Sequence, residues 1–124
     1  MGLPTLKQMF AELMQTCSVS CTTPSLDHSN EGVIRLLDRW CHSLGFHTEV
    51  QPIPDFPGKF NLMAVKGSGP GGLVFAGHTD TVPCDEALWN KPPFALTEQD
   101  NRWYGLGSAD MKGFFPFVLE AVRT

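Results

Sequence analysis

The sequence of 124 residues predicts one α/β domain, in which helices pack against a sheet. Apolar residues recur at helical spacing near both ends of the chain and around residue 37, and alternating segments between them are typical of strands. Residues 73–76 are apolar on both faces, as in a strand buried between two layers. A chain of this length buries roughly two-thirds of its unfolded surface, so it needs no disulfide or metal to form a core.

Two amphipathic helices are expected in the first 45 residues. The first follows Pro4 and carries an apolar face made of Leu3, Leu6, Phe10, Leu13, Met14 and Cys17. After a polar, proline-containing connection over residues 18–25, the second helix carries a face made of Val33, Leu36, Leu37, Trp40, Cys41 and Leu44. Gly45 is placed to end this second helix in a left-handed conformation.

The rest of the chain alternates between short strands and turns. Residues 46–51 and 60–66 are expected to be strands, and the prolines between them predict a loop. Asp100 and Asn101 predict a hairpin turn between residues 94–97 and 102–104. The last helix covers residues 114–122, with Pro116 either near its start or at a kink, and its pattern still runs at Thr124, so we expect a truncated segment.

Composition argues against several classes of partner. Thirteen acidic and nine basic residues give a net charge of −4 and a pI near 5.4, which disfavours nucleic acid and anionic membrane surfaces. No apolar stretch approaches the ~18 residues of a membrane span, and the N-terminus lacks a signal-peptide pattern, so we expect a cytoplasmic protein. The four cysteines are expected to be free thiols, since they form no CxxC pair.

Two segments carry residues suited to metal chemistry. The first, GHTDTVP at residues 77–83, directly follows the predicted buried strand, where ligands bind in open α/β sheets. In an extended backbone His78 and Asp80 point to the same side, so Asp80 can accept the proton of the imidazole nitrogen that is not bonded to metal. In the second segment, residues 105–113, the carboxylate of Asp110 can bridge two cations about 3.5–4 Å apart. Such donors suit zinc, with cobalt or manganese as substitutes.

Other interpretations of these residues remain open at this point. A histidine and an aspartate after a strand can simply cap backbone groups. Gly105 and Gly107 resemble the start of a phosphate loop, but the next glycine, at 113, is out of register. The remaining histidines (His28, His42 and His47) are expected to be solvated, Lys112 to be exposed to solvent, and Cys84 to be a small apolar filler.

Together the two segments resemble a known enzyme family. GHTDTVP, a loop with Trp, Pro and Phe, and then YGLGSADMKGFF are similar to the dinuclear zinc amidohydrolases, which include deacetylases, desuccinylases, aminoacylases and carboxypeptidases. Leu106, Phe114-Phe115 and Lys59-Phe60-Asn61 match the acetylornithine deacetylase group, whereas desuccinylases usually have Arg between the two glycines. The resemblance implies a three-layer α/β/α zinc-peptidase-like catalytic domain, of which residues 1–124 form the N-terminal portion.

The resemblance also implies roles for three residues. His78 would ligate one zinc ion, Asp80 would orient His78 as part of the catalytic machinery, and Asp110 would bridge two zinc ions. The peptide bond between Asp110 and Met111 would be cis. The family's general base and its remaining ligands lie further downstream than residue 124, so we expect this chain alone to be inactive.

The implied reaction is hydrolysis of N-acetylornithine, a small N-acyl amino acid, to ornithine and acetate in arginine biosynthesis. Full-length members of the family are often homodimers. The alternatives are a desuccinylase, aminoacylase or dipeptidase with the same metal chemistry, or a non-catalytic truncated fragment.

Overall fold

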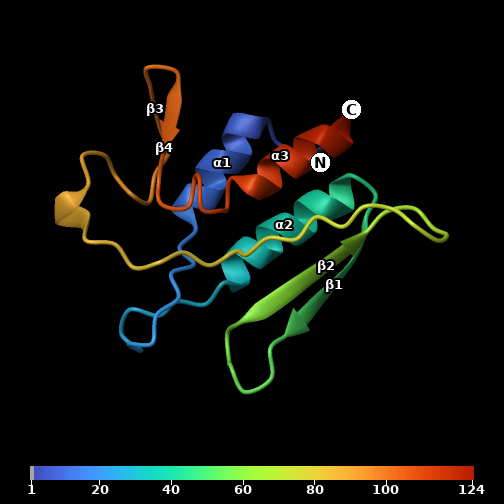
Figure 1. The fold of residues 1–124 in the computed structure, drawn as a ribbon, viewed down its shortest axis with the longest axis horizontal. Coiled ribbons are helices and arrows are strands. Elements are labelled where there is room, and N and C mark those ends of the chain that lie inside the picture. The colour runs from blue at the N-terminus through green and yellow to red at the C-terminus, as the bar shows by residue number, and fades with distance from the viewer. Residues whose placement is uncertain (1) are drawn as a thin grey trace.

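The computed structural model describes residues 2–124, which form a mixed α/β arrangement (Figure 1). The helices are α1 (Leu6–Gln15), α2 (Glu31–Ser43) and α3 (Phe114–Arg123), with a short 3₁₀ helix at Glu86–Leu88. The strands are β1 (His47–Pro52), β2 (Phe60–Val65), β3 (Thr97–Gln99) and β4 (Arg102–Tyr104). No helix in this part of the chain has the length and apolar character needed to cross a bilayer.

Both predicted N-terminal helices are confirmed, and each has a local signal at one end. Thr5 and Gln8 form a capping box at the start of α1, in which each side chain accepts the other residue's backbone N–H, at 2.9 and 3.2 Å. Past the end of α2, Gly45 has a φ of 81°, and its N–H donates to the carbonyl of His42. The left-handed glycine therefore terminates α2 as the sequence predicts.

The strands form two separate antiparallel pairs. β1 pairs with β2 from His47 opposite Val65 to Pro52 opposite Phe60, and β3 pairs with β4. Asp100 and Asn101 have φ angles of 52° and 59° between β3 and β4, as a type I′ hairpin turn requires. The predicted turn and second strand are confirmed, but the first strand is Thr97–Gln99 and not residues 94–97.

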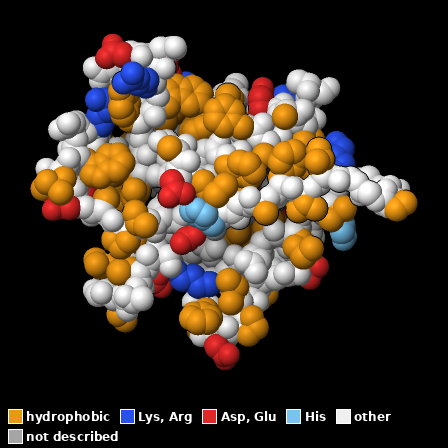
Figure 2. All heavy atoms as spheres, in the orientation of Figure 1, with side chains coloured by type: hydrophobic (Ala, Val, Ile, Leu, Met, Phe, Trp, Pro, Cys, Tyr) orange, Lys and Arg blue, Asp and Glu red, His pale blue; other side chains and the backbone are white. Residues whose placement is uncertain are grey.

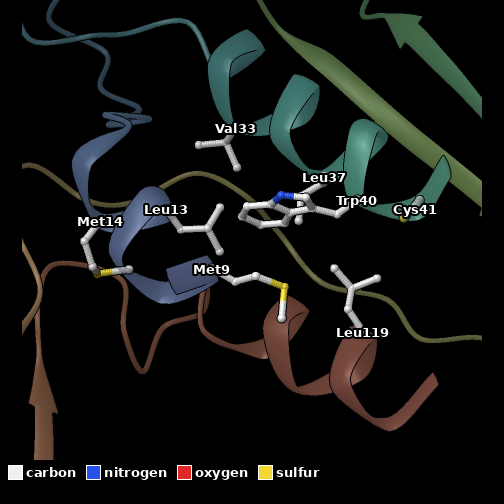
Figure 3. Close-up of a cluster of buried hydrophobic side chains, with 8 residues drawn as sticks. All are labelled: Met9, Leu13, Met14, Val33, Leu37, Trp40, Cys41 and Leu119. Carbon is white, nitrogen blue, oxygen red and sulfur yellow. The ribbon is translucent and has the colours of Figure 1, made fainter. Parts of the chain in front are cut away.

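The hydrophobic core lies where the three helices meet (Figure 3). α1 supplies three of its side chains, α2 four and α3 one; these are Met9, Leu13, Met14, Val33, Leu37, Trp40, Cys41 and Leu119. Burying each of the larger apolar side chains stabilises the fold by about 1.5–3 kcal/mol. All four cysteines are free thiols, as expected, and burial raises the pKa of Cys41 to about 11.

The start of the last helix shows which of the two expected positions Pro116 takes. α3 begins at Phe114, so Pro116 lies in its first turn, where the missing N–H costs no helical hydrogen bond. The helix therefore starts near the proline and does not kink around it. The side chain of Pro116 is buried, as is that of Leu119.

The predicted strand at residues 73–76 is wrong. This segment pairs with no strand in the described structure, and its side chains are exposed: Leu73 by 86%, Val74 by 91% and Phe75 by 60%. A strand apolar on both faces needs neighbouring strands and a covering layer on each side. β2 pairs only with β1, so residues 2–124 supply neither, and the three-layer arrangement is not formed. Figure 2 shows that hydrophobic side chains are exposed to solvent on the face of the molecule seen in Figure 1.

Candidate metal centre

His78 follows a glycine that lies tightly against the start of α3. A Cβ at Gly77 would lie 2.9 Å from Met111 Cε, 3.0 Å from Phe114 Cδ1 and 3.1 Å from Phe115 Cζ. These separations are shorter than ordinary carbon contacts. A larger residue at position 77 would therefore require these side-chain atoms to shift, and the close approach brings His78 toward the loop that precedes α3.

The residues after His78 are held by the polar connection between α1 and α2. The Ser18 hydroxyl donates to the Thr79 carbonyl at 2.7 Å, and the Thr81 N–H donates to the Ser18 carbonyl at 3.1 Å. The Ser20 N–H then donates to the Thr81 carbonyl at 2.9 Å, and Val19 and Thr81 form an isolated parallel bridge. The polar connection that follows α1 therefore fixes residues 79–81 by backbone pairing.

The loop over residues 105–113 lies directly on Thr81. Gly107 has a φ of 85°, and a Cβ there would lie 2.7 Å from Thr81 Cγ2, so both its conformation and its surroundings require glycine. The Gly113 N–H donates to the Gly107 carbonyl at 3.2 Å and closes the loop. The peptide bond between Asp110 and Met111 is cis, which confirms that prediction.

The three predicted site residues converge around the His78 ring. Its Nε2 lies 3.1 Å from Asp110 Oδ1, although the two residues are 32 positions apart. Its Nδ1 lies 3.1 Å from both the carbonyl and the carboxylate Oδ1 of Asp80. Each ring nitrogen thus faces a different carboxylate, the arrangement that the spacing of His78 and Asp80 predicts.

The two carboxylates shift the protonation of His78. Partial desolvation lowers the pKa of the imidazole, but the hydrogen bond to the Asp80 carbonyl and the charges of Asp80 and Asp110 raise it more. The net effect is a pKa above the ordinary histidine value. The pair of carboxylates therefore favours a cation at this point.

The donor chemistry suits zinc, but the number of donors does not complete a site. Imidazole and carboxylate are preferred zinc ligands, and His78 Nε2 and Asp110 Oδ1 face each other. Asp80 lies on the opposite ring nitrogen and is not available to the same ion. Within residues 2–124 no group of three His, Cys, Asp or Glu side chains is arranged to hold a metal. The chain provides two ligands where a closed tetrahedral site needs four.

Lys112 departs from its predicted exposure. Its side chain is only 2% exposed, and Nζ donates to the carbonyl of Thr16 at 2.8 Å. Burial lowers the pKa of this lysine to about 8. The prediction of an exposed first-turn lysine is wrong because α3 begins only at Phe114, so Lys112 belongs to the preceding turn and points toward the end of α1. The Thr16 carbonyl follows the last residue of α1, where helix carbonyls lack a partner within the helix, so the lysine satisfies one of them.

The remaining candidates play no part in the cluster. His28, His42 and His47 are exposed, as expected. Cys84 is half-buried, and desolvation, followed by the nearby Glu86 and Asp85, raises the pKa of its thiol. The thiol is therefore held in its neutral form, which suits a filler better than a ligand.

Comparisons with known proteins agree with this geometry. Residues 74–124, which include His78, Asp80 and Asp110, match the sequence profile of peptidase family M20/M25/M40. Acetylornithine deacetylases from Photorhabdus laumondii and Klebsiella pneumoniae are each 55% identical to this chain over 98% of its length. The one from Proteus mirabilis is 53% identical over the same share.

The fold is similar to part of one solved structure. Human carnosine dipeptidase 1 superposes with a TM-score of 0.73 and 27% identity, over 95% of this chain and 27% of that one. The chain likewise spans about a third of the curated relatives, 31% of the Photorhabdus enzyme and 32% of the Klebsiella enzyme. Taken with the paired carboxylates around His78, the chain is similar to peptidase family M20/M25/M40 over residues 74–124 and to about a third of acetylornithine deacetylases over nearly its whole length.

Proposed function

We propose that the protein containing this chain hydrolyses the amide bond of N-acetylornithine and releases ornithine and acetate. The observation that carries the proposal is the convergence of His78, Asp80 and Asp110, residues from two distant segments, at 3.1 Å contacts. Identity of 55% to acetylornithine deacetylases supports the choice of a small N-acyl amino acid as the substrate. Ornithine as product makes arginine biosynthesis the proposed setting.

Asp80 and Asp110 have different roles at the two nitrogens of the His78 imidazole ring. Asp80 accepts the Nδ1 proton of His78, which fixes the tautomer in which Nε2 has a free lone pair. His78 Nε2 and Asp110 would then hold the metal, which supplies Lewis-acid activation of an acyl carbonyl and of water. Zinc is the ion we propose, with cobalt or manganese as functional substitutes. In the overall reaction the acetyl carbon gains an oxygen from water, its bond to nitrogen breaks, and the amine leaves with a proton.

The chain by itself is proposed to lack turnover. Its described residues offer two facing ligands to the metal, and among them no group of three His, Cys, Asp or Glu side chains is arranged to hold one. A reaction of this kind needs both a complete ligand set and a group that moves the proton to the leaving amine. We propose that further segments supply the remaining groups, since the chain spans 31% of the Photorhabdus laumondii acetylornithine deacetylase that it resembles.

A dipeptidase is the second candidate. The superposition on human carnosine dipeptidase 1 covers nearly the whole chain, and cleavage of a dipeptide uses the same chemistry on a different amide. The higher identity to the deacetylases favours N-acetylornithine. Leu106, which lies between Gly105 and Gly107 and is buried, disfavours a desuccinylase.

A chimeric enzyme tests the proposal. This chain would replace the matching third of the Klebsiella pneumoniae acetylornithine deacetylase, and hydrolysis of N-acetylornithine, N-succinyl-diaminopimelate and carnosine would be compared. We expect N-acetylornithine to be preferred, and His78→Ala or Asp110→Ala to lower kcat/KM at least about 100-fold. His47→Ala, the same change at an exposed histidine of β1, is the matched control and should retain activity.

Two outcomes would overturn the proposal. Preference for carnosine would establish the dipeptidase instead. Full activity of the His78→Ala chimera, equal to that of His47→Ala, would remove His78 from the site altogether.

A further inference from the structure

We propose that Asn30 is a positioning residue for the candidate metal centre, acting through the hydroxyl of Thr79. This inference rests on the proposed function, because it concerns how His78 and Asp80 are presented. It arises from a buried polar network that lies behind the His78 turn and uses neither of the proposed ligands.

Asn30 uses its whole amide group in long-range contacts. Its Nδ2 donates to the Phe60 carbonyl and to Thr79 Oγ1, both at 2.9 Å, and its Oδ1 accepts the Phe60 N–H at 2.9 Å. The residue is only 9% exposed, so these hydrogen bonds are shielded from water. The amide therefore joins three elements: the start of α2, the first residue of β2 and the His78 turn.

These long-range hydrogen bonds are unusual for a residue at the start of a helix. Asn30 is the N-cap residue of α2, where asparagine ordinarily accepts a backbone N–H of the first helical turn. Its side chain makes no such bond, and the hydroxyl of Ser29 accepts the Glu31 N–H at 3.0 Å instead. The Asn30 side chain therefore does not cap α2, and its hydrogen bonds go to Phe60 and Thr79.

Thr79 lies between the two proposed functional residues and faces the other way. His78 and Asp80 are exposed, whereas Thr79 is half-buried, as the alternation of an extended chain requires. Asn30 holds the Thr79 hydroxyl, and Ser18 holds the Thr79 carbonyl at 2.7 Å. With both groups held from the inside, rotation of the turn is restrained, and His78 keeps its direction toward Asp110.

Such fixation matters for a metal ligand. A coordinating side chain works only when it is held within about 0.5 Å and 10–20° of its productive geometry. Loss of the partners that orient ligands typically lowers metal affinity 10–100-fold. The Asn30 to Thr79 contact is the connection through which α2 and β2 set the His78 geometry.

The decisive variant is Thr79→Val in the 124-residue chain, with Thr79→Ser as the conservative rescue. Valine keeps the shape but removes the hydroxyl, while leaving both Asn30 contacts to Phe60 intact. Thr48→Val is the matched control, since Thr48 is a half-buried threonine whose hydroxyl bonds Asp38 and His42, away from the His78 cluster. The measurements are the dissociation constants for Zn²⁺ and Co²⁺, the ¹⁵N shifts of the His78 ring, and the Tm.

We expect Thr79→Val to weaken metal binding on the order of 10-fold and to move the His78 ring shifts, and Thr79→Ser to restore both. Thr48→Val should change only the Tm. In an Asn30→Ala background the effect of Thr79→Val should vanish, because both substitutions remove the same contact.

The outcomes separate this inference from the proposed function. If Zn²⁺ binds the parent chain no better than it binds His78→Ala, the proposed metal site fails, and the ring shifts alone decide the role of Asn30. If Thr79→Val behaves like Thr48→Val in both affinity and ring shifts, Asn30 supports the fold only, and the inference is overturned.

Discussion

His78 gives a direct example of how spacing along a strand-like segment produces a site. Its partner two residues later takes Nδ1, and this leaves Nε2 toward Asp110 on a different loop. A carboxylate at an odd spacing would point to the other side of the chain and leave the ring free to turn. The geometry of the site therefore depends on residue 80 as much as on the ligands.

Gly77 provides a test at the same scale. Gly77→Ala should lower the free energy of unfolding by about 1 kcal/mol, because the side chains of Met111, Phe114 and Phe115 would have to shift to admit its Cβ. Urea denaturation followed by circular dichroism measures this change. Gly2→Ala, where no atom lies within 4 Å of the added Cβ, is the control. Equal stability of the two variants would show that the close approach at Gly77 is not required.

The sequence predicts the candidate site residues better than the buried residues that hold their loops in place. His78, Asp80 and Asp110 stand in compact motifs, and the structure brings them together as expected. Asn30 and Lys112 were missed because their partners lie far along the chain: Thr79 is 49 residues from Asn30, and Thr16 is 96 residues from Lys112. No local pattern marks a contact of that range, and both side chains belong to types that are usually exposed.

At the level of elements, the end of α1 and the loop before α3 are linked by one buried charge. Lys112 places its ammonium group against the Thr16 carbonyl, at the negative end of the α1 dipole. The same burial that lowers its pKa to about 8 makes its charged form costly. The contact connects the Asp110 loop to the helical core at the expense of stability near neutral pH.

The pH dependence of Lys112→Met follows from that shift. The folded pKa of Lys112 is about 8 and its reference value is 10.5, so between these values the unfolded chain binds more protons and stability rises with pH. From pH 7 to pH 10 the parent chain should gain on the order of 2–3 kcal/mol relative to Lys112→Met. Urea unfolding of both proteins at each pH measures this difference. A difference that stays constant with pH would contradict the buried charge.

Elements with local signals were predictable, and those that depend on neighbours were not. The capping box of α1, Gly45 after α2 and the Asp100-Asn101 turn each act within a few residues, and all three elements form as expected. The apolar pattern of residues 73–76 is typical of a strand that is covered on both faces, and such a strand forms only where neighbouring strands and covering layers are present. The described chain does not supply those surroundings, so the pattern alone does not make a strand.

On the scale of the whole molecule, both the sheet and the candidate metal centre lack partners within the described residues. The apolar segment at residues 73–76 has no neighbouring strand, and the His78–Asp110 pair has no third ligand within residues 2–124. Both features fit a chain that spans about a third of its relatives. We infer that His78 and Asp110 form part of a metal centre that needs further ligands.

Calorimetric titration of the purified chain with Zn²⁺, beside His78→Ala and Asp110→Ala, tests whether these two residues alone hold a metal ion. We expect weak binding of a single ion that is lost in both variants, with no hydrolysis of N-acetylornithine by the same sample, because two ligands hold one ion poorly. Tight binding of two zinc ions together with turnover would contradict the account, since it would show that the 124-residue chain builds a complete site by itself.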